Sequence, residues 1–535
     1  MKIMRCSRQG LQRFVMGGVW LPLTVLAGPR FDPAFGAGGV ATAEFAEPFS
    51  SLSEAHAIGV LPDGRILLVG SGNFIPTAAS VSEWTVMFAR LQAQGQRDAS
   101  FGSGGIKPVP LASFAAAAGV PVESVAMRQG TTLPGGQVLL AGSLSTDWRL
   151  PSVPVMGRFT TEGELDPSFA GQGLALLNRN WPSGWAQPAV TSFAMQSDGG
   201  IVLLVRGTMQ GTGRVSNSAW LVRLESSGQL DLAFGSEGRA EIALDAPIQS
   251  DRVLVEPGLQ GGIVVALGFR ESLPARQGIV VMRFDGRGVR DTEYGDDENG
   301  QITILPAADP QPVGIRGAEM QSDGRLLLLV SIPFRSDSVV VRLDPSGQPD
   351  AEFGVDGSFW FQDTAGSRTG AGLQVDGDSG ILFAGSLGNA GSSQTLRLSR
   401  LHPDGEPDRT YTQSPWPGFE EPGLFESRPL TEFSHFSVTA LVPDAAGRVL
   451  LAGNSQREIV VGQDEFGADI VEPRQGFLVV RVTDDASSPF PILGFESVNY
   501  SVREGSQADC AWPEEGVCLR RSEERRVGKE CRSRW

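Results

Sequence analysis

Seven aspartates at a regular spacing are the residues of this chain that could carry acid–base chemistry. Each stands three residues before an aromatic residue that is usually followed by Gly, and successive copies are 58 to 68 residues apart. The seven are Asp32, Asp98, Asp166, Asp231, Asp291, Asp350 and Asp408. Carboxylates can act as general acids and bases, but an active site breaks symmetry and these positions keep it. Since Asp in such turns caps backbone amides, we interpret the seven as structural and predict no catalytic residue.

Two further acidic loops have the donor chemistry of a cation site. Asp296–Gly300 and Asp376–Gly380 place oxygen-bearing side chains at alternate positions, which suits a hard cation such as calcium. Neither loop continues to the terminal Glu of an EF-hand, and Asp376 also occupies the ordinary hairpin position of the other repeats. We therefore expect no cofactor, with calcium at one of these loops as the alternative.

Histidine chemistry and phosphate binding have little support in the sequence. The only three histidines, His56, His402 and His435, are isolated among turns or strands, and no zinc-ligand spacing occurs. The abundant Gly belongs to turns rather than to a phosphate loop before a helix. A formal net charge of −17 would also repel phosphate backbones, so a nucleic-acid partner is not expected.

The elements that must position the aspartates are short strands, four to each repeat. A Gly-led strand follows the aromatic turn, and a second apolar segment ends in a turn such as Asp63-Gly64, which permits the positive φ of a tight hairpin. The third segment is a continuous apolar run, as in 65–70 and 137–142, and predicts a strand that is covered on both faces. An Arg stands near the end of the fourth segment.

This Arg recurs once in every repeat. The seven are Arg90, Arg158, Arg223, Arg283, Arg342, Arg400 and Arg481. One group repeated seven times favours a structural role, in which each Arg makes a charged hydrogen bond between neighbouring blades or to a loop carbonyl. Ligand recognition by these arginines is the alternative.

Seven repeats of four strands predict an all-β fold, a seven-bladed β-propeller of four-stranded blades over residues 28–483. Regular periods of this kind indicate stacked units that cannot fold alone. Radial repetition also leaves only short, protected sheet edges. A β-solenoid is the alternative architecture, although its rungs normally recur at shorter periods.

Three stretches of the sequence resemble a known family. Asp166–Phe169, Pro62–Gly70 and Val340–Asp350 resemble the bacterial delta-60 repeat, and the resemblance covers roughly residues 30–483. Two repeats depart from the pattern, since Ala170 replaces the Gly after the aromatic and Tyr411 has no Gly after it. The resemblance implies an exported bacterial surface or extracellular protein, and it carries no catalytic signature.

The N-terminus has the pattern of a secretion signal. Basic residues precede the apolar stretch Phe14–Leu26 and small residues end at Ala27, so residues 1–27 are predicted to be a signal peptide. This stretch is too short to span a bilayer comfortably. We therefore expect a secreted, cell-surface or periplasmic protein with no membrane span in the mature chain. In an oxidising compartment Cys510 and Cys518 either pair or remain separate thiols.

A second module begins after the repeats. Residues 484–491 are interpreted as a Pro-marked linker, and Ile492–Gly505 resembles the opening of a Calx-beta domain, so residues 492–520 would be a fragment of a β-sandwich. In that family the Glu before the Gly can be a calcium ligand, and it maps to Glu504; an exposed strand Glu is the alternative. Residues 521–535 resemble a translated sequencing adapter, and we exclude them from functional reasoning.

The sequence favours a non-enzymatic binding or adhesion scaffold at the cell surface or outside the cell. We expect a monomer that binds an unknown extracellular protein or glycan through the faces and axial channel of the propeller. The alternative is an extracellular glycan-binding or glycan-degrading enzyme with its site on divergent loops such as 178–190 and 411–436. Trp181, Trp185 and Trp416 in those loops could stack on sugar rings, or they could be buried between blades.

Overall fold

Strands fill most of the chain that the computed structural model describes. The described residues are 29–45, 51–74, 83–147, 149–177, 181, 185, 187–208, 218–244, 246–257, 261–272, 275–296, 299–304, 314–332, 337–362, 370–387, 395–412, 422–427, 430–444, 447–463 and 469–483. They belong to a unit that spans Met1–Ala486, and a second unit spans Ser487–Trp535. The expected signal peptide, linker and Calx-beta-like segment, with Glu504, Cys510 and Cys518, lie outside the described residues.

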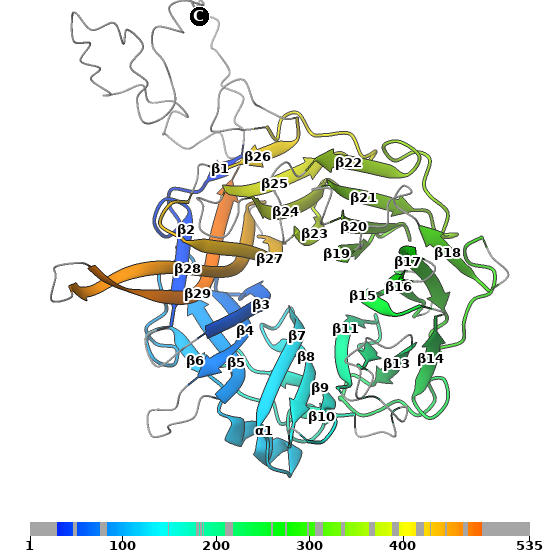
Figure 1. Cartoon of the computed structure of the whole chain (residues 1–535), viewed down its shortest axis with the longest axis horizontal. Coiled ribbons are helices and arrows are strands. Elements are labelled where there is room, and N and C mark those ends of the chain that lie inside the picture. Colours follow the sequence, from blue (N-terminus) through cyan, green and yellow to red (C-terminus); the bar gives the residue numbers. More distant parts are fainter. Residues whose placement is uncertain are drawn as a thin grey trace, which may run out of the picture. The chain divides into compact units, whose positions relative to one another are not determined.

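Six sheets each consist of four consecutive antiparallel strands and follow one another around a ring (Figure 1). Blade 1 contains β3 (Ser51–Val60), β4 (Ile66–Phe74), β5 (Glu83–Leu91) and β6 (Ile106–Pro108). Blade 2 contains β7 (Ser124–Thr132), β8 (Val138–Ser145), β9 (Val153–Phe159) and β10 (Leu174–Leu176). Blade 3 contains β11 (Ala189–Met195), β12 (Ile201–Arg206), β13 (Ser218–Leu224) and β14 (Arg239–Ala243).

The next three blades repeat this order. Blade 4 contains β15 (Ile248–Val255), β16 (Ile263–Ser272), β17 (Ala275–Phe284) and β18 (Gln301–Ile304). Blade 5 contains β19 (Gly314–Met320), β20 (Leu326–Ile332), β21 (Asp337–Leu343) and β22 (Ser358–Gln362). Blade 6 contains β23 (Gly370–Val375), β24 (Ile381–Leu387), β25 (Thr395–Leu401) and β26 (Leu424–Glu426). In every blade the first strand lies nearest the centre of the ring (Figure 1).

Blade 7 joins the two ends of the propeller. It contains β27 (His435–Pro443), β28 (Val449–Gln463) and β29 (Asp469–Thr483), and its outermost strand is β2 (Val40–Glu44) from the start of the chain. Val40 lies opposite Val480 in this pairing, and the short β1 (Arg30–Phe31) pairs with the end of β29. The predicted seven-bladed propeller is confirmed, and the solenoid alternative is wrong.

The sequence repeat and the blade are offset by one strand. The Gly-led strand after each aromatic turn completes the preceding blade, while the other three strands of the repeat begin the next blade. The first Gly-led strand, β2, therefore has no blade of its own and is available to pair with β29. This offset closes the ring, because the open edge of the last blade and the spare first strand satisfy each other's backbone hydrogen bonds.

The second strand of each blade is covered on both faces, as its continuous apolar run predicts. In blade 1, Ile66 and Leu68 pack into a core shared with blade 7, while Leu67 and Val69 pack into a core shared with blade 2. Each fully buried aliphatic side chain of this kind contributes about 1.5–3 kcal/mol. No blade can bury both faces without its two neighbours, so the ring folds as one unit.

One helix occurs in the described part of the chain. α1 (Leu111–Ala118) lies in the connection from β6 to β7 and buries Leu111 and Phe114. It ends at Gly119, whose positive φ of 70° and backbone N–H bond to Ala115 form a left-handed cap. This helix is far too short to cross a membrane, so the described residues contain no membrane-spanning helix.

Candidate functional site

The seven repeat arginines each form an ion pair with a repeat aspartate. In six blades the Arg lies near the end of the third strand and the Asp follows eight residues later, in the turn toward the fourth strand. In blade 7, Arg481 Nε lies 2.7 Å from Oδ2 of Asp32, at the other end of the chain. The pairs are Arg90–Asp98, Arg158–Asp166, Arg223–Asp231, Arg283–Asp291, Arg342–Asp350, Arg400–Asp408 and Arg481–Asp32. We call each Arg, its Asp and the following aromatic a clasp.

The second carboxylate oxygen of each clasp aspartate caps the turn. Asp98 Oδ1, for example, accepts the backbone N–H of Ser100 at 3.1 Å, and Asp350 Oδ1 accepts that of Glu352 at 3.0 Å. The Ser100 hydroxyl also donates to Asp98, which together with the two arginine partners holds the pKa of this carboxyl far below its usual range. Both oxygens are occupied, so these aspartates serve the fold, as their symmetry predicts.

The clasp arginines also reach the next blade. Arg283 Nη1 donates to the carbonyl of Pro345 at 2.9 Å, and Arg481 Nη1 donates to that of Ala93 at 2.8 Å. These bonds confirm the predicted contact between blades and to loop carbonyls. The pairing with Asp was missed in the sequence, although the constant spacing of eight residues was a usable signal.

Burial excludes the best-covered clasp arginines from ligand recognition. Arg90, Arg342 and Arg481 are 3–5% exposed. The guanidinium of Arg342 also lies over the ring of Phe353, 4.6 Å from its centroid, and five of the clasps show this cation–π contact.

The clasp aromatic is pressed against a glycine turn of the following blade. In blade 5, Phe353 is fully buried beside Gly405 of blade 6, where an added Cβ would lie 2.9 Å from the ring. Gly354, which follows Phe353, donates its N–H to the carbonyl of Asp404 in the same turn at 2.8 Å. The repeated Gly positions are therefore sites of close backbone approach between blades.

The acidic loop at 376–380 is a structural turn. Asp376 Oδ1 accepts the backbone N–H groups of Asp378 and Gly380, at 2.9 and 2.8 Å, and Oδ2 accepts Nε of Arg400 at 2.8 Å. In the other loop, Asp297 and Glu298 lie outside the described residues. Within the described part, no three acidic, His or Cys side chains gather as a metal site would require. Calcium binding by this chain stays the alternative to the expected absence of a cofactor.

The histidines lie on three different blades. His56, on β3, has Nε2 2.9 Å from the Ser71 hydroxyl, and burial together with the nearby Arg128 lowers its pKa to about 4. His402 lies in the turn after β25, where its backbone bonds to Glu406 as a hairpin position requires. His435 begins β27. His56 is thus neutral near pH 7 and shares no described contact with the other two.

Two of the three candidate tryptophans pack into the protein. Trp181 and Trp185 stack with their ring centroids 6.0 Å apart and their planes 10° from parallel. Trp185 is 5% exposed, and an added Cβ at Gly207 would lie 2.7 Å from its indole ring. Both belong to the core between blades 2 and 3, which supports the burial interpretation. Trp416 lies outside the described residues.

The connections on the two faces of the propeller differ in how much their lengths vary from blade to blade. On one face, the turn from the first to the second strand has five residues in six blades, and the clasp turns lie on the same side. We call this the clasp face. On the opposite face, which we call the variable face, the connections range from two residues (273–274) to fifteen (109–123). Loops that differ between repeats are where a repeated scaffold carries function, so the variable face is the candidate binding surface.

One of the two loops expected to carry a site crosses between these faces. Residues 411–436 begin in the enlarged clasp turn of blade 6, pass through β26 and the connection after it, and end in the first two residues of β27. They do not form a single loop, because β26 divides them. This short outer strand was missed in the sequence analysis. Residues 178–188 do belong to the variable face, and residues 189–190 already lie in β11.

The innermost strands present a further set of residues that differ from blade to blade. In five blades the first strand has a β-bulge four residues before its end. The extra residues are His56, Arg128, Thr191, Arg316 and Thr439. A bulge re-aims the side chain of its extra residue, and two of these side chains bond to a Ser on the second strand, His56 to Ser71 and Arg316 to Ser331. The sequence showed them only as polar residues in an apolar segment.

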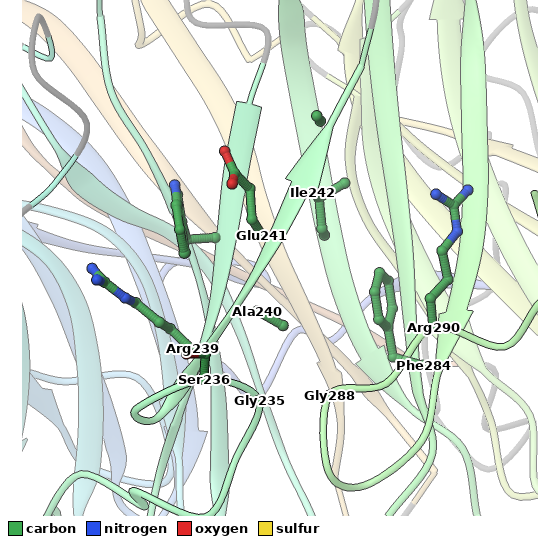
Figure 2. Close-up of a pocket in the computed structure, with 11 residues that line it drawn as sticks. Gly235, Ser236, Arg239, Ala240, Glu241, Ile242, Phe284, Gly288 and Arg290 are labelled. Carbon is green, nitrogen blue, oxygen red and sulfur yellow. The ribbon is translucent and has the colours of Figure 1, made fainter.

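A groove of about 470 Å³ runs along the rim strand β14. Figure 2 shows Arg239 and Glu241 on one side of this strand, and Ala240, Ile242 and Phe284 on the other. A smaller groove of about 330 Å³ lies at the equivalent place along β2. Because the two grooves recur at the same repeat positions, they follow from how each outer strand meets the next blade, and neither is a dedicated site.

A match to one protein-family model agrees with the propeller architecture. A family model described as a β-propeller domain of unknown function, DUF5122, matches residues 378–411. No curated protein matches the chain. A streptogramin B lyase structure is 11% identical, with 82% of this chain and 96% of that chain covered and a TM-score of 0.37.

Two further solved structures have similar scores. An ulvan lyase of a polysaccharide lyase family is 11% identical over 81% of this chain and 95% of its own, with a TM-score of 0.41. The NanB sialidase of Streptococcus pneumoniae is 8% identical over 82% and 70%, with a TM-score of 0.34. Likenesses at this level carry no argument about activity, and the chain is described by its fold, a seven-bladed β-propeller of four-stranded blades.

Proposed function

We propose that this protein is a non-enzymatic binding scaffold, exported from a bacterial cell, that holds its partner on the variable face. The observation that carries the proposal is that the charged side chains of the clasps are already paired within the protein. Their seven arginines and seven aspartates are paired with one another, so the most numerous charged groups of the repeat are committed to the fold. What differs between blades, and can therefore distinguish one ligand from another, lies in the connections of the variable face.

Two exposed apolar residues make the variable face testable. Val120 and Leu150 are 44% and 57% exposed in connections of that face. Leu232 and Val355 are 64% and 75% exposed in clasp turns and provide a matched pair on the opposite face. Exposed apolar residues rimmed by polar ones are common at binding surfaces. Neither pair contributes to a buried core, so substitutions there should leave the fold intact.

The test is binding of the labelled protein to a glycan array and to intact bacterial cells. The double variant Val120→Asp/Leu150→Asp should lose about tenfold or more in affinity, which corresponds to about 1.4 kcal/mol. The control Leu232→Asp/Val355→Asp should bind like the parent protein. Equal loss in both variants, or loss only in the control, would contradict the proposed face. Turnover of any glycan on incubation would contradict the non-enzymatic role.

Export rests on the N-terminal pattern and has its own test. N-terminal sequencing of the protein recovered from the culture medium or periplasm should begin at Gly28. A chain that retains residues 1–27 and stays in the cytoplasm would refute export, and it would leave the binding role of the variable face to be judged by the array.

A further inference from the structure

Blade 7 carries a two-stranded arm that the other blades lack. β28 and β29 have fifteen residues each, whereas the second and third strands of the other blades have six to ten. The neighbours of β28 and β29 end early, with β27 pairing no further than Gln456 and β2 no further than Gly476. Residues 457–463 and 469–474 therefore pair along their backbones only with each other among the described residues, and they project from the ring (Figure 1). We call these two stretches the arm.

The arm exposes apolar side chains. Val460, Val461 and Val471 are 60%, 45% and 48% exposed, and they account for three of the eleven large exposed apolar residues in the described part of the chain. An isolated two-stranded ribbon is at best marginally stable in water. A partner that covers the valines and adds a strand to the sheet would bury the exposed apolar surface and stabilise the two-stranded ribbon.

Only one edge of the arm is suited to accept another strand. On the β29 side, Pro473 lacks the N–H group that a new neighbour would need, which is a common device for blocking a sheet edge. On the β28 side, the last bond of the established sheet runs from the Ser434 N–H to the Gln456 carbonyl at 2.8 Å. The edge of β28 beyond Gln456 continues the line of β27, so a strand antiparallel to β28 would extend an existing ladder.

We propose that a second copy of this chain fills this position, with the β28 edges of two arms pairing antiparallel about a two-fold axis. A bulge between Val460 and Gly462 limits the regular edge to residues 457–460. Pairing centred on Ile459 places this residue opposite Ile459 of the other copy, and Glu458 opposite Val460. No like charges face each other, whereas parallel pairing would set Glu458 against itself.

Electrostatics and symmetry agree with this choice of partner. Arg457 is already neutralised by Glu44 on β2, with Nη2 2.7 Å from Oε2, so it adds no unpaired positive charge to the paired edge. A two-fold axis uses the same edge in both chains. Because the arms project, the two rings, each part of a chain with a net charge of −17, stay apart. The expected monomer is thereby replaced by a weak dimer.

The experiment is sedimentation velocity of the full chain from about 1 to 200 µM, the range in which a small interface dissociates. The parent protein should pass from monomer to dimer over this range. Val460→Glu places a like charge opposite Glu458 of the other copy and should weaken the dimer at least about tenfold. Val355→Glu, at a more exposed valine of the clasp face, should leave the dimer unchanged.

Two outcomes would overturn the proposal. One is a parent protein that stays monomeric up to the highest concentration, and the other is equal weakening by Val355→Glu and Val460→Glu. If the glutamate variant failed to fold by circular dichroism, Val460→Thr would replace it. Threonine keeps the β-branched shape and should weaken the dimer by a smaller factor than glutamate. The binding proposal for the variable face is independent of either result.

Discussion

Replacing Asp32 by Asn should destabilise the propeller by several kilocalories per mole, because it removes only the charge that balances Arg481. Asn keeps the side-chain oxygen that accepts the N–H of Ala34 at 2.9 Å, so the turn cap survives. Arg481 is 5% exposed and would lose its partner at 2.7 Å. Arg448, 3.7 Å from the same oxygen, keeps its own partner Asp444 at 2.7 Å, so the uncompensated charge would be that of Arg481. Removing one member of a buried pair costs about 3–5 kcal/mol.

This loss is large because the pair joins the first and last strands of the ring. Against a total stability of about 5–15 kcal/mol, it would bring the variant near the folding threshold. Urea unfolding followed by tryptophan fluorescence measures it. The control is Asp285→Asn, in an exposed turn where Oδ1 accepts the N–H of Arg287 at 2.9 Å and no ion pair to Asp285 occurs among the described residues. It should cost less than about 1 kcal/mol.

A double-mutant cycle separates the ion pair from other effects. Arg481→Met combined with Asp32→Asn should cost less than the sum of the two single changes, since each single variant strands a buried charge that the double variant lacks. Equal losses for Asp32→Asn and Asp285→Asn, or strictly additive losses in the cycle, would refute the structural reading of the clasp.

Four further outcomes are expected. Gly405→Ala should cost about 2–3 kcal/mol in urea, because its φ is +86° and a Cβ would meet an aromatic ring, whereas Gly38→Ala, with φ +63° and nothing within 4 Å, should cost about 1 kcal/mol. Ala170→Gly should stabilise the protein by about 1 kcal/mol, since Ala170 has a φ of +51° where five other clasps have Gly; a loss of stability would contradict this. Burial raises the pKa of Glu319 from its ordinary value of 4.5 to about 7. The folded protein therefore loses stability as the pH rises from about 4.5 to 7, and it carries the full cost of ionising Glu319 above pH 7. Glu319→Gln should therefore add on the order of 2 kcal/mol at pH 8 and little at pH 4.5, and a pH-independent effect would refute the assignment. Trp185→Ala should cost about 3–5 kcal/mol without changing the glycan-array profile, and a selective loss of glycan binding at unchanged stability would restore the sugar-stacking alternative.

The number of blades and the identity of their strands could be predicted from the sequence because both rest on short-range patterns. The interval between clasp aspartates counts the units, and apolar runs such as Ile66–Val69 in the second strand identify the strand that is buried on both faces. The hairpin turns were also local, since Asp-Gly at 63–64 selects a tight turn without help from the rest of the chain. The capping role of the clasp aspartates followed from the same local chemistry.

Long-range pairing was decided by the tertiary structure. Nothing near Val40 indicates that its partner is Val480, because register between segments hundreds of residues apart depends on the whole ring closing. Burial of Trp185 was equally non-local, since it requires Gly207 from the neighbouring strand connection. The arm projects because β28 and β29 extend beyond the strands that flank them. The sequence of one strand does not show where its neighbours end. Local sequence thus determines the strands and turns of each blade. The packing of blades around the ring determines which sheet edges and which faces stay exposed and can bind partners.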